Sequence, residues 1–180
     1  MTTFILIAVF ILGLFMVLGL HTSDEVKTEI EIDSSANEVW KILSNFEEYA
    51  QWNPFITKIS GELRKNAPIE VTIALPFSQS LVFPLKVARQ TRGKEMVWLG
   101  ETLAPNILDA LHTFQINKLG PNKVQFVQTE KVSGLLLYIL LPFYKSAMER
   151  NFKKMNLALK NKAEGVVAIS EPAQVSTGAA

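Results

Sequence analysis

The sequence contains no cysteine, and this absence excludes several kinds of site at once. Without thiols there is no disulfide framework, no cysteine nucleophile and no thiolate ligand for a metal ion. Histidine is also scarce, because His21 and His112 are the only two. Two histidines and no cysteine argue against a catalytic zinc ion, which usually takes three protein ligands. We therefore expect no metal and no organic cofactor.

The sequence also has no large excess of positive or negative charge. The chain of 180 residues has 18 Lys and Arg against 17 Asp and Glu, and no dense basic run. Nucleic acids require a basic footprint that neutralises phosphates, so we expect no nucleic-acid partner. The sequence also lacks a G-x-S-x-G elbow and a phosphate-binding glycine-rich loop. With 48% apolar and 19% charged residues, the composition is that of one globular domain with a substantial core.

A long apolar run opens the chain. Residues 4–20, FILIAVFILGLFMVLGL, carry no charge, and about 17 to 20 such residues suffice to cross a bilayer. A secretory signal would show a basic start, a shorter apolar core and a small-residue cleavage site, none of which is evident. We predict an uncleaved, single-pass membrane anchor over residues 1–22; a cleaved atypical signal and a buried core helix are the alternatives. No Lys or Arg precedes the run, so the side of the membrane is left open.

The rest of the chain divides into a domain, residues 23–164, and a tail, residues 165–180. The tail is small, polar and aperiodic, which predicts disorder. The domain opens with an alternating strand pattern, EVKTEIEID, whose inward face consists of Val26, Thr28, Ile30 and Ile32. Ser35 and Glu38 then form a capping box, which predicts a short helix. Its apolar stripe consists of Ala36, Val39, Trp40 and Leu43.

Six further strands and a long helix follow. The strand candidates are FITKIS, IEVTIAL, SLVFPLKVARQ, EMVWLGET, LDALHTFQINK and KVQFVQTEKV. Because they are consecutive and separated by turns, antiparallel hairpins are expected. From Pro142, placed in the first helical turn, the apolar period changes to that of an amphipathic helix. Its stripe consists of Met148, Phe152, Met155 and Leu159.

Three local motifs resemble one superfamily. SANEVWKILSNFEEYAQWNPFITKISGE, TEKVSGLLLYILLP and NFKKMNLALKNKAE are similar to the opening, the passage into the last helix and the ending of START-like, or SRPBCC, domains. The similarity is strongest to the polyketide cyclase/dehydrase-like branch. The resemblance implies an α+β helix-grip fold, with a curved antiparallel sheet of about six or seven strands around the C-terminal helix. It also implies a largely apolar cavity between sheet and helix.

The last two predicted strands bring polar groups to that cavity. Pairing apolar residues sets Ile116 opposite Val124 and Phe114 opposite Phe126, with a three-residue loop, 119–121. The same register sets His112 opposite Gln128 and Ala110 opposite Glu130. We therefore predict a polar group on the inner wall, made by His112, Gln128 and Glu130. For His112 a hydrogen-bonded core position is the alternative, and for Glu130 a solvated rim position or a bond to the loop at Ser133 and Gly134.

Eleven residues are candidates for contact with a ligand. In the corner WNPF we expect Trp52 mainly in the core and Asn53 and Phe55 nearer the cavity mouth. Trp98 and the helical stripe are candidates for lining, with a core position as the alternative. The complete set is Asn53, Phe55, Trp98, His112, Phe114, Phe126, Gln128, Glu130, Met148, Phe152 and Met155. His112 and Glu130 are the candidates for acid–base catalysis.

Two classes of function compete. The first is membrane-tethered binding or transfer of a hydrophobic small molecule such as a lipid, a quinone or a polyketide-like compound. The second is a cyclase or dehydratase that uses His112 and Glu130 on a polyketide-like substrate. An interaction domain with a filled core is a third possibility. The run GLLLYILLPF before the last helix is apolar on every side, which indicates either burial or a portal facing the membrane.

Overall fold

The computed structural model describes residues 23–74, 79–102, 108–134 and 137–165, together with positions 4, 5, 7, 10 and 13. Apart from those five positions, the predicted anchor lies outside the described residues, and so does the predicted tail beyond Gly165. Within the described part of the chain, no helix combines the length and apolar character needed to cross a bilayer.

One antiparallel sheet of seven strands forms the body of the domain, in the order β1-β7-β6-β5-β4-β3-β2. The strands from β2 to β7 follow one another as hairpins, and β1 pairs with β7. This confirms the seven predicted strands and the helix-grip class. The strands are β1 (Ser23–Ile32), β2 (Ile56–Gly61), β3 (Pro68–Ala74), β4 (Ser80–Thr91), β5 (Glu95–Thr102), β6 (Leu108–Gly120) and β7 (Lys123–Ser133).

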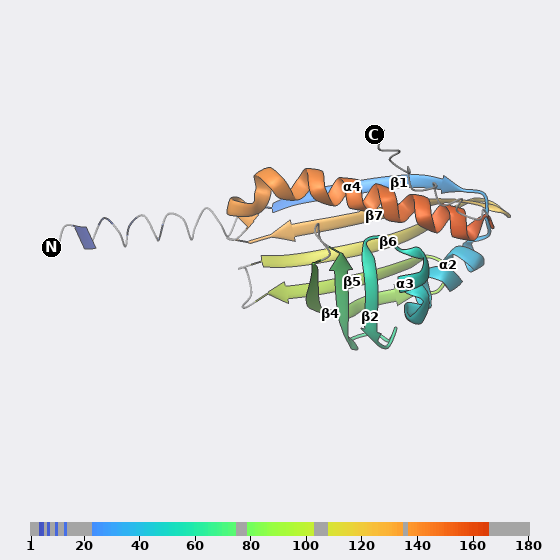
Figure 1. Cartoon of the computed structure of the whole chain (residues 1–180), viewed down its shortest axis with the longest axis horizontal. Coiled ribbons are helices and arrows are strands. Elements are labelled where there is room, and N and C mark those ends of the chain that lie inside the picture. Colours follow the sequence, from blue (N-terminus) through green and yellow to red (C-terminus); the bar gives the residue numbers. More distant parts are fainter. Residues whose placement is uncertain are drawn as a thin grey trace, which may run out of the picture.

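Helices cover one face of this sheet. Figure 1 shows the long helix α4 (Leu137–Ala163) beside β1 and β7, with α2 (Ala36–Ser44) and α3 (Tyr49–Trp52) near its C-terminal end. A short 3-10 turn, η1 (Phe46–Glu48), joins the two small helices. The predicted N-cap is confirmed, because Ser35 Oγ accepts a hydrogen bond of 3.2 Å from the Glu38 N–H. The predicted stripe of α2 is buried against the core.

The apolar stripe of α4 packs into the sheet as predicted. Phe152, Met155 and Leu159 are completely buried. A polar contact fixes the helix to β1, since Asn156 Nδ2 donates a hydrogen bond of 2.9 Å to Thr28 Oγ1. The start of the helix differs from the prediction.

The helix α4 begins at Leu137, so Pro142 is its sixth residue and not part of its first turn. A proline inside a helix removes one hydrogen bond, here to the carbonyl of Tyr138, but the bonds on either side can persist. The preceding residues, LYILL, contain no other helix breaker. The apolar run before the proline therefore extends the helix.

The register of the β6–β7 hairpin is shifted by two residues from the predicted one. His112 pairs with Glu130 and not with Gln128, and the other predicted pairs move in the same way. The physical cause is the turn, which consists of residues 121–122 and is preceded by a bulge at Leu119, in place of the predicted three-residue loop. Strand side chains alternate with a period of two, so a shift of two leaves every side chain on its predicted face.

Candidate functional site

The space between the sheet and α4 is filled at one end and hollow at the other. At the filled end, large side chains from β6, β7 and α4 are at most 1% exposed: Phe114, Phe126, Phe152, Met155 and Leu159. At the other end lies a cavity of about 350 Å³. The interior therefore differs from the completely filled core that was considered as an alternative.

The walls of this cavity are mainly apolar. Strands β3 and β4 contribute one wall, formed by Val71, Ile73, Leu81, Phe83 and Leu85. Phe55 comes from the WNPF corner, Ile56 is the first residue of β2, and Tyr144 and Met148 come from α4. Small residues on β5 and β6, Gly100 and Ala110, leave room between these walls. Such a lining favours an apolar ligand.

Three polar side chains, His112, Glu130 and Tyr144, also face the cavity. The His112 and Glu130 side chains are 12% and 15% exposed, and the distance from His112 Nδ1 to Glu130 Oε2 is 3.5 Å. The two lie side by side because β6 and β7 place them directly opposite each other. A histidine and a carboxylate in partial burial form an arrangement suited to hydrogen bonding or proton transfer.

Both ring nitrogens of His112 have protein partners. Gln128 Nε2 lies 3.0 Å from His112 Nε2, and also 3.6 Å from the sulfur of Met155. With the Gln128 amide as donor, His112 Nε2 is the acceptor and the ring proton lies on Nδ1, facing Glu130. His112 is therefore oriented between two protein groups, and Glu130 and Tyr144 are the polar groups better placed for a ligand.

Tyr144 has the capacity to bind a ligand. Burial is the first cause that raises the pKa of Tyr144 above its usual value of 10, and the nearby charge of Glu130 is the second. The hydroxyl therefore stays protonated and remains a donor. Among the described residues, the indole N–H of Trp98 has no hydrogen-bond partner, whereas the Tyr144 hydroxyl lies beside the Glu130 carboxylate, whose interaction with it contributes to the raised pKa. An unpaired buried polar group costs about 1–3 kcal/mol, which an acceptor on a ligand would recover.

The structure brings five of the predicted site residues together around the cavity: Phe55, Trp98, His112, Glu130 and Met148. Four others, Phe114, Phe126, Phe152 and Met155, belong to the filled end of the core. All nine lie on the inner side of the domain. An inward direction is therefore shared by the candidates that line the cavity and by the candidates that pack against other side chains, and it does not distinguish them.

The two remaining candidates have structural contacts instead. Gln128 is completely buried and lies behind His112, outside the cavity lining. Asn53 is 3% exposed, and its Oδ1 accepts hydrogen bonds from the N–H groups of Phe55 (2.9 Å) and Ile56 (2.8 Å). Asn53 therefore holds the turn at the WNPF corner and does not line the cavity mouth.

Sequence reasoning missed Tyr144 and the wall formed by β3 and β4. Tyr144 precedes Met148 by four residues, so it continues the helical stripe by one turn. That spacing was a usable signal. The β4 residues Leu81, Phe83 and Leu85 lie in a segment for which the sequence predicted only a strand, with no residue assigned to the cavity.

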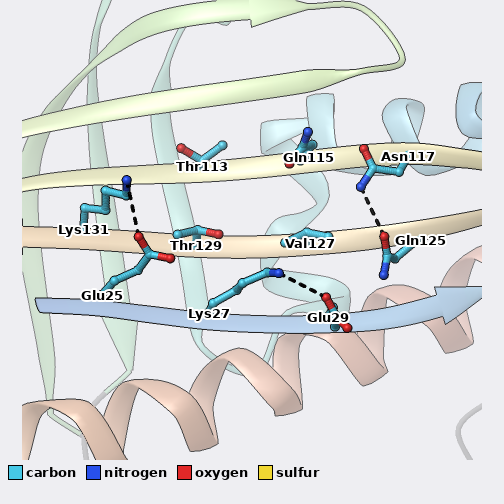
Figure 2. Close-up of a pocket in the computed structure, with 10 residues that line it drawn as sticks. All are labelled: Glu25, Lys27, Glu29, Thr113, Gln115, Asn117, Gln125, Val127, Thr129 and Lys131. Atoms are coloured by element: carbon cyan, nitrogen blue, oxygen red, sulfur yellow. Dashed lines mark hydrogen bonds and ion pairs between the residues drawn. The ribbon is translucent and has the colours of Figure 1, made fainter.

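A second hollow, of about 480 Å³, lies on the outer face of β1, β6 and β7 (Figure 2). Six of its side chains form ion pairs or hydrogen bonds with one another. Lys27 lies 3.4 Å from Glu29, Lys131 lies 3.4 Å from Glu25, and Asn117 donates to Gln125 over 3.2 Å. This hollow is open, polar and solvated, so the inner cavity is the candidate site.

A metal centre has no support from the geometry. Within the residues that the structure describes, no group of three or more His, Asp or Glu side chains is arranged to hold a metal ion.

Comparison with known protein families gives a match over most of the chain. Residues 23–164 match the family described as polyketide cyclase/dehydrase and lipid transport. A search of curated proteins finds no significant match.

Several solved structures share the fold. A START superfamily protein from Mycobacterium smegmatis is 22% identical, with a TM-score of 0.63, over 79% of this chain and 99% of that chain. The Zhui aromatase/cyclase from Streptomyces sp. R1128 is 14% identical, with a TM-score of 0.64, over 83% and 99%. Norcoclaurine synthase from Thalictrum flavum, solved with dopamine and hydroxybenzaldehyde, is 10% identical, with a TM-score of 0.60, over 78% and 86%. At these identities the similarity concerns the fold.

Proposed function

Because the chain belongs to the polyketide cyclase/dehydrase and lipid transport family, we propose that it binds a hydrophobic small molecule between its sheet and α4. The observation that carries this proposal is the cavity of about 350 Å³, with apolar walls and three polar side chains. Small-molecule pockets usually have about 300–1,000 Å³ and this composition. Since an engineered cavity of about 150 Å³ holds benzene, a molecule of two or three rings is a suitable size.

We further propose that residues 4–20 tether the domain to a membrane, as a single-pass anchor. The support is their unbroken apolar sequence and the described positions within them. Four of these positions are helical and more than half exposed: Phe4, Ile5, Ile7 and Phe10. A tether would keep the cavity near a ligand dissolved in the bilayer. Flotation of the full chain with vesicles tests the tether, and a chain that stays at the bottom of the gradient contradicts it.

Filling the cavity tests the binding proposal. Ala110 lines the cavity from β6, and Ala110→Phe would place a ring inside it. We expect this variant to bind the fluorescent probe N-phenyl-1-naphthylamine roughly tenfold more weakly, a loss of about 1.4 kcal/mol. The amount of any lipid-like molecule that co-purifies in mild detergent, measured by mass spectrometry, should fall in parallel.

The adjacent residue supplies the control. Leu111 lies on the opposite face of β6, so Leu111→Phe should leave probe binding unchanged. If the wild-type protein neither binds the probe nor carries a lipid-like molecule, the proposed binding function is wrong.

A cyclase or dehydratase is the second candidate function. The observation in its favour is the pair His112 and Glu130, 3.5 Å apart, beside the Tyr144 hydroxyl at the cavity. Such groups could remove a proton from a polyketide-like substrate and return one to the oxygen that leaves as water. Incubation with an aromatic precursor that carries a poly-β-keto chain, followed by mass spectrometry, tests this. Equal product in the presence of native and heat-denatured protein would eliminate the enzyme hypothesis.

A further inference from the structure

The cavity lies at the end of the sheet where β1 begins. Ser23 pairs with Ser133, which in turn pairs with Asp109, so the start of β1, the end of β7 and the start of β6 meet there. We call this the cavity end. Two cavity-lining residues, Leu108 and Val132, lie at or next to these strand ends. Figure 1 shows the start of β1 and the start of α4 at the same end of the molecule.

The chain between the apolar run and the sheet is very short. Leu20 is the last residue of the run, and Ser23, three residues later, is the first residue of β1. A fully extended residue spans at most about 3.6 Å, so Ser23 lies within roughly 11 Å of Leu20 whatever the linker conformation. A bilayer that contains the run must therefore lie close to the cavity end. The opposite end, with the β6–β7 turn, is a full strand length away.

Exposed apolar side chains occur at the rim of the cavity end. Leu81, the second residue of β4, lines the cavity and is nevertheless 47% exposed, which places it at the mouth. Its neighbour Val82, on the outer face of β4, is 56% exposed. Apolar rim residues of this kind lose unfavourable contact with water when they enter the interfacial region of a bilayer.

Two ion pairs lie at the cavity end. Lys145 Nζ lies 2.9 Å from Asp24 Oδ1, and this bond holds the pKa of Asp24 below its usual value. Lys131 and Glu25 form a further pair on the outer face. Each pair has no net charge, so these residues do not favour an anionic lipid over a zwitterionic one. A zwitterionic surface such as phosphatidylcholine is the matching partner.

We infer that the cavity end lies against the membrane surface, with Leu81 and Val82 at the contact, so that a ligand passes between bilayer and cavity without crossing bulk water. This inference rests on the proposed tether and adds the orientation of the domain to it. It also identifies the partner as the phospholipid surface itself.

The absence of cysteine makes a direct test simple. Single substitutions Val82→Cys, Leu119→Cys and Leu157→Cys can each be labelled with an NBD fluorophore in the full chain. The three native side chains are similarly exposed, at 56%, 53% and 53%. Leu119 lies at the far turn and Leu157 on the outer side of α4, so both are matched controls.

The full chain is reconstituted in phosphatidylcholine vesicles, and flotation first establishes attachment. We expect the label at position 82 to shift its emission to the blue and to be protected from iodide quenching, whereas labels at positions 119 and 157 remain accessible. If the chain floats and all three labels are quenched equally, the orientation is wrong and the tether stands. If the chain does not float, the tether is wrong and the orientation fails with it.

Discussion

Phe152→Ala should lower the free energy of unfolding by about 3–5 kcal/mol, the usual range for removing a completely buried phenylalanine. Phe152 is 0% exposed and lies at the centre of the interior. Its ring centroid is 5.1 Å from that of His112 and 6.0 Å from that of Phe55. Removing the ring would both open a void and loosen the contact between α4 and the sheet. Urea denaturation followed by circular dichroism measures the change.

Leu157 provides the control on the same helix. It lies outside the stripe and is largely exposed, so Leu157→Ala should change the free energy of unfolding by no more than about 0.5 kcal/mol. Equal destabilisation by the two substitutions would contradict the division of α4 into an inner and an outer side. Because Phe152 borders the hollow half, its loss should also let the cavity accept a longer ligand.

The second large effect concerns the polar group of the ligand. We expect 2-naphthol to bind more tightly than naphthalene, because its hydroxyl can donate to the Glu130 carboxylate and accept from Tyr144. A hydrogen bond to a charged group contributes about 1.5–3 kcal/mol, which corresponds to roughly 10- to 100-fold in affinity. Glu130→Gln keeps the shape and an acceptor for His112 but removes the charge. It should eliminate most of the preference for naphthol, as measured by fluorescence titration.

Naphthalene itself serves as the control ligand, since its affinity should be the same in wild-type protein and in Glu130→Gln. Tyr144→Phe should reduce the preference for naphthol less, because it removes a neutral donor. Equal binding of both compounds to the wild-type protein would show that Glu130 and Tyr144 do not contact the ligand. Binding of neither compound would contradict the binding function for molecules of this size.

The architecture was predictable because its signals are local. The alternation in β1, the cap at Ser35 and the spacing of the α4 stripe each specify an element within a few residues of sequence. The β6–β7 register was missed because the segment around Leu119 allows more than one turn, and a bulge decides between them. The start of α4 differs from the prediction because a helix can continue through the one hydrogen bond that Pro142 removes.

For the candidate site, the sequence predicted only which side chains point toward the interior. Alternation showed that His112, Phe114, Phe126 and Glu130 point inward, and the two-residue shift of register preserved this. Whether an inward side chain meets another side chain or a hollow depends on how all the elements pack together. No window of sequence contains that information. The sequence did not reveal Tyr144 for the same reason, because the residues that line the cavity with it come from β3, β4 and β7.

The unequal filling of the interior has a consequence for how the domain can change. The filled half, around Phe114, Phe126 and Met155, consists of fully buried side chains, while the cavity lies in the half near β3 and β4. Because Phe83 and Leu85 are only partly buried, we expect substitutions there to change the shape of the cavity at a smaller cost to folding than substitutions in the filled half. A domain divided in this way can acquire new ligands over evolution, or in the laboratory, while the same scaffold is retained.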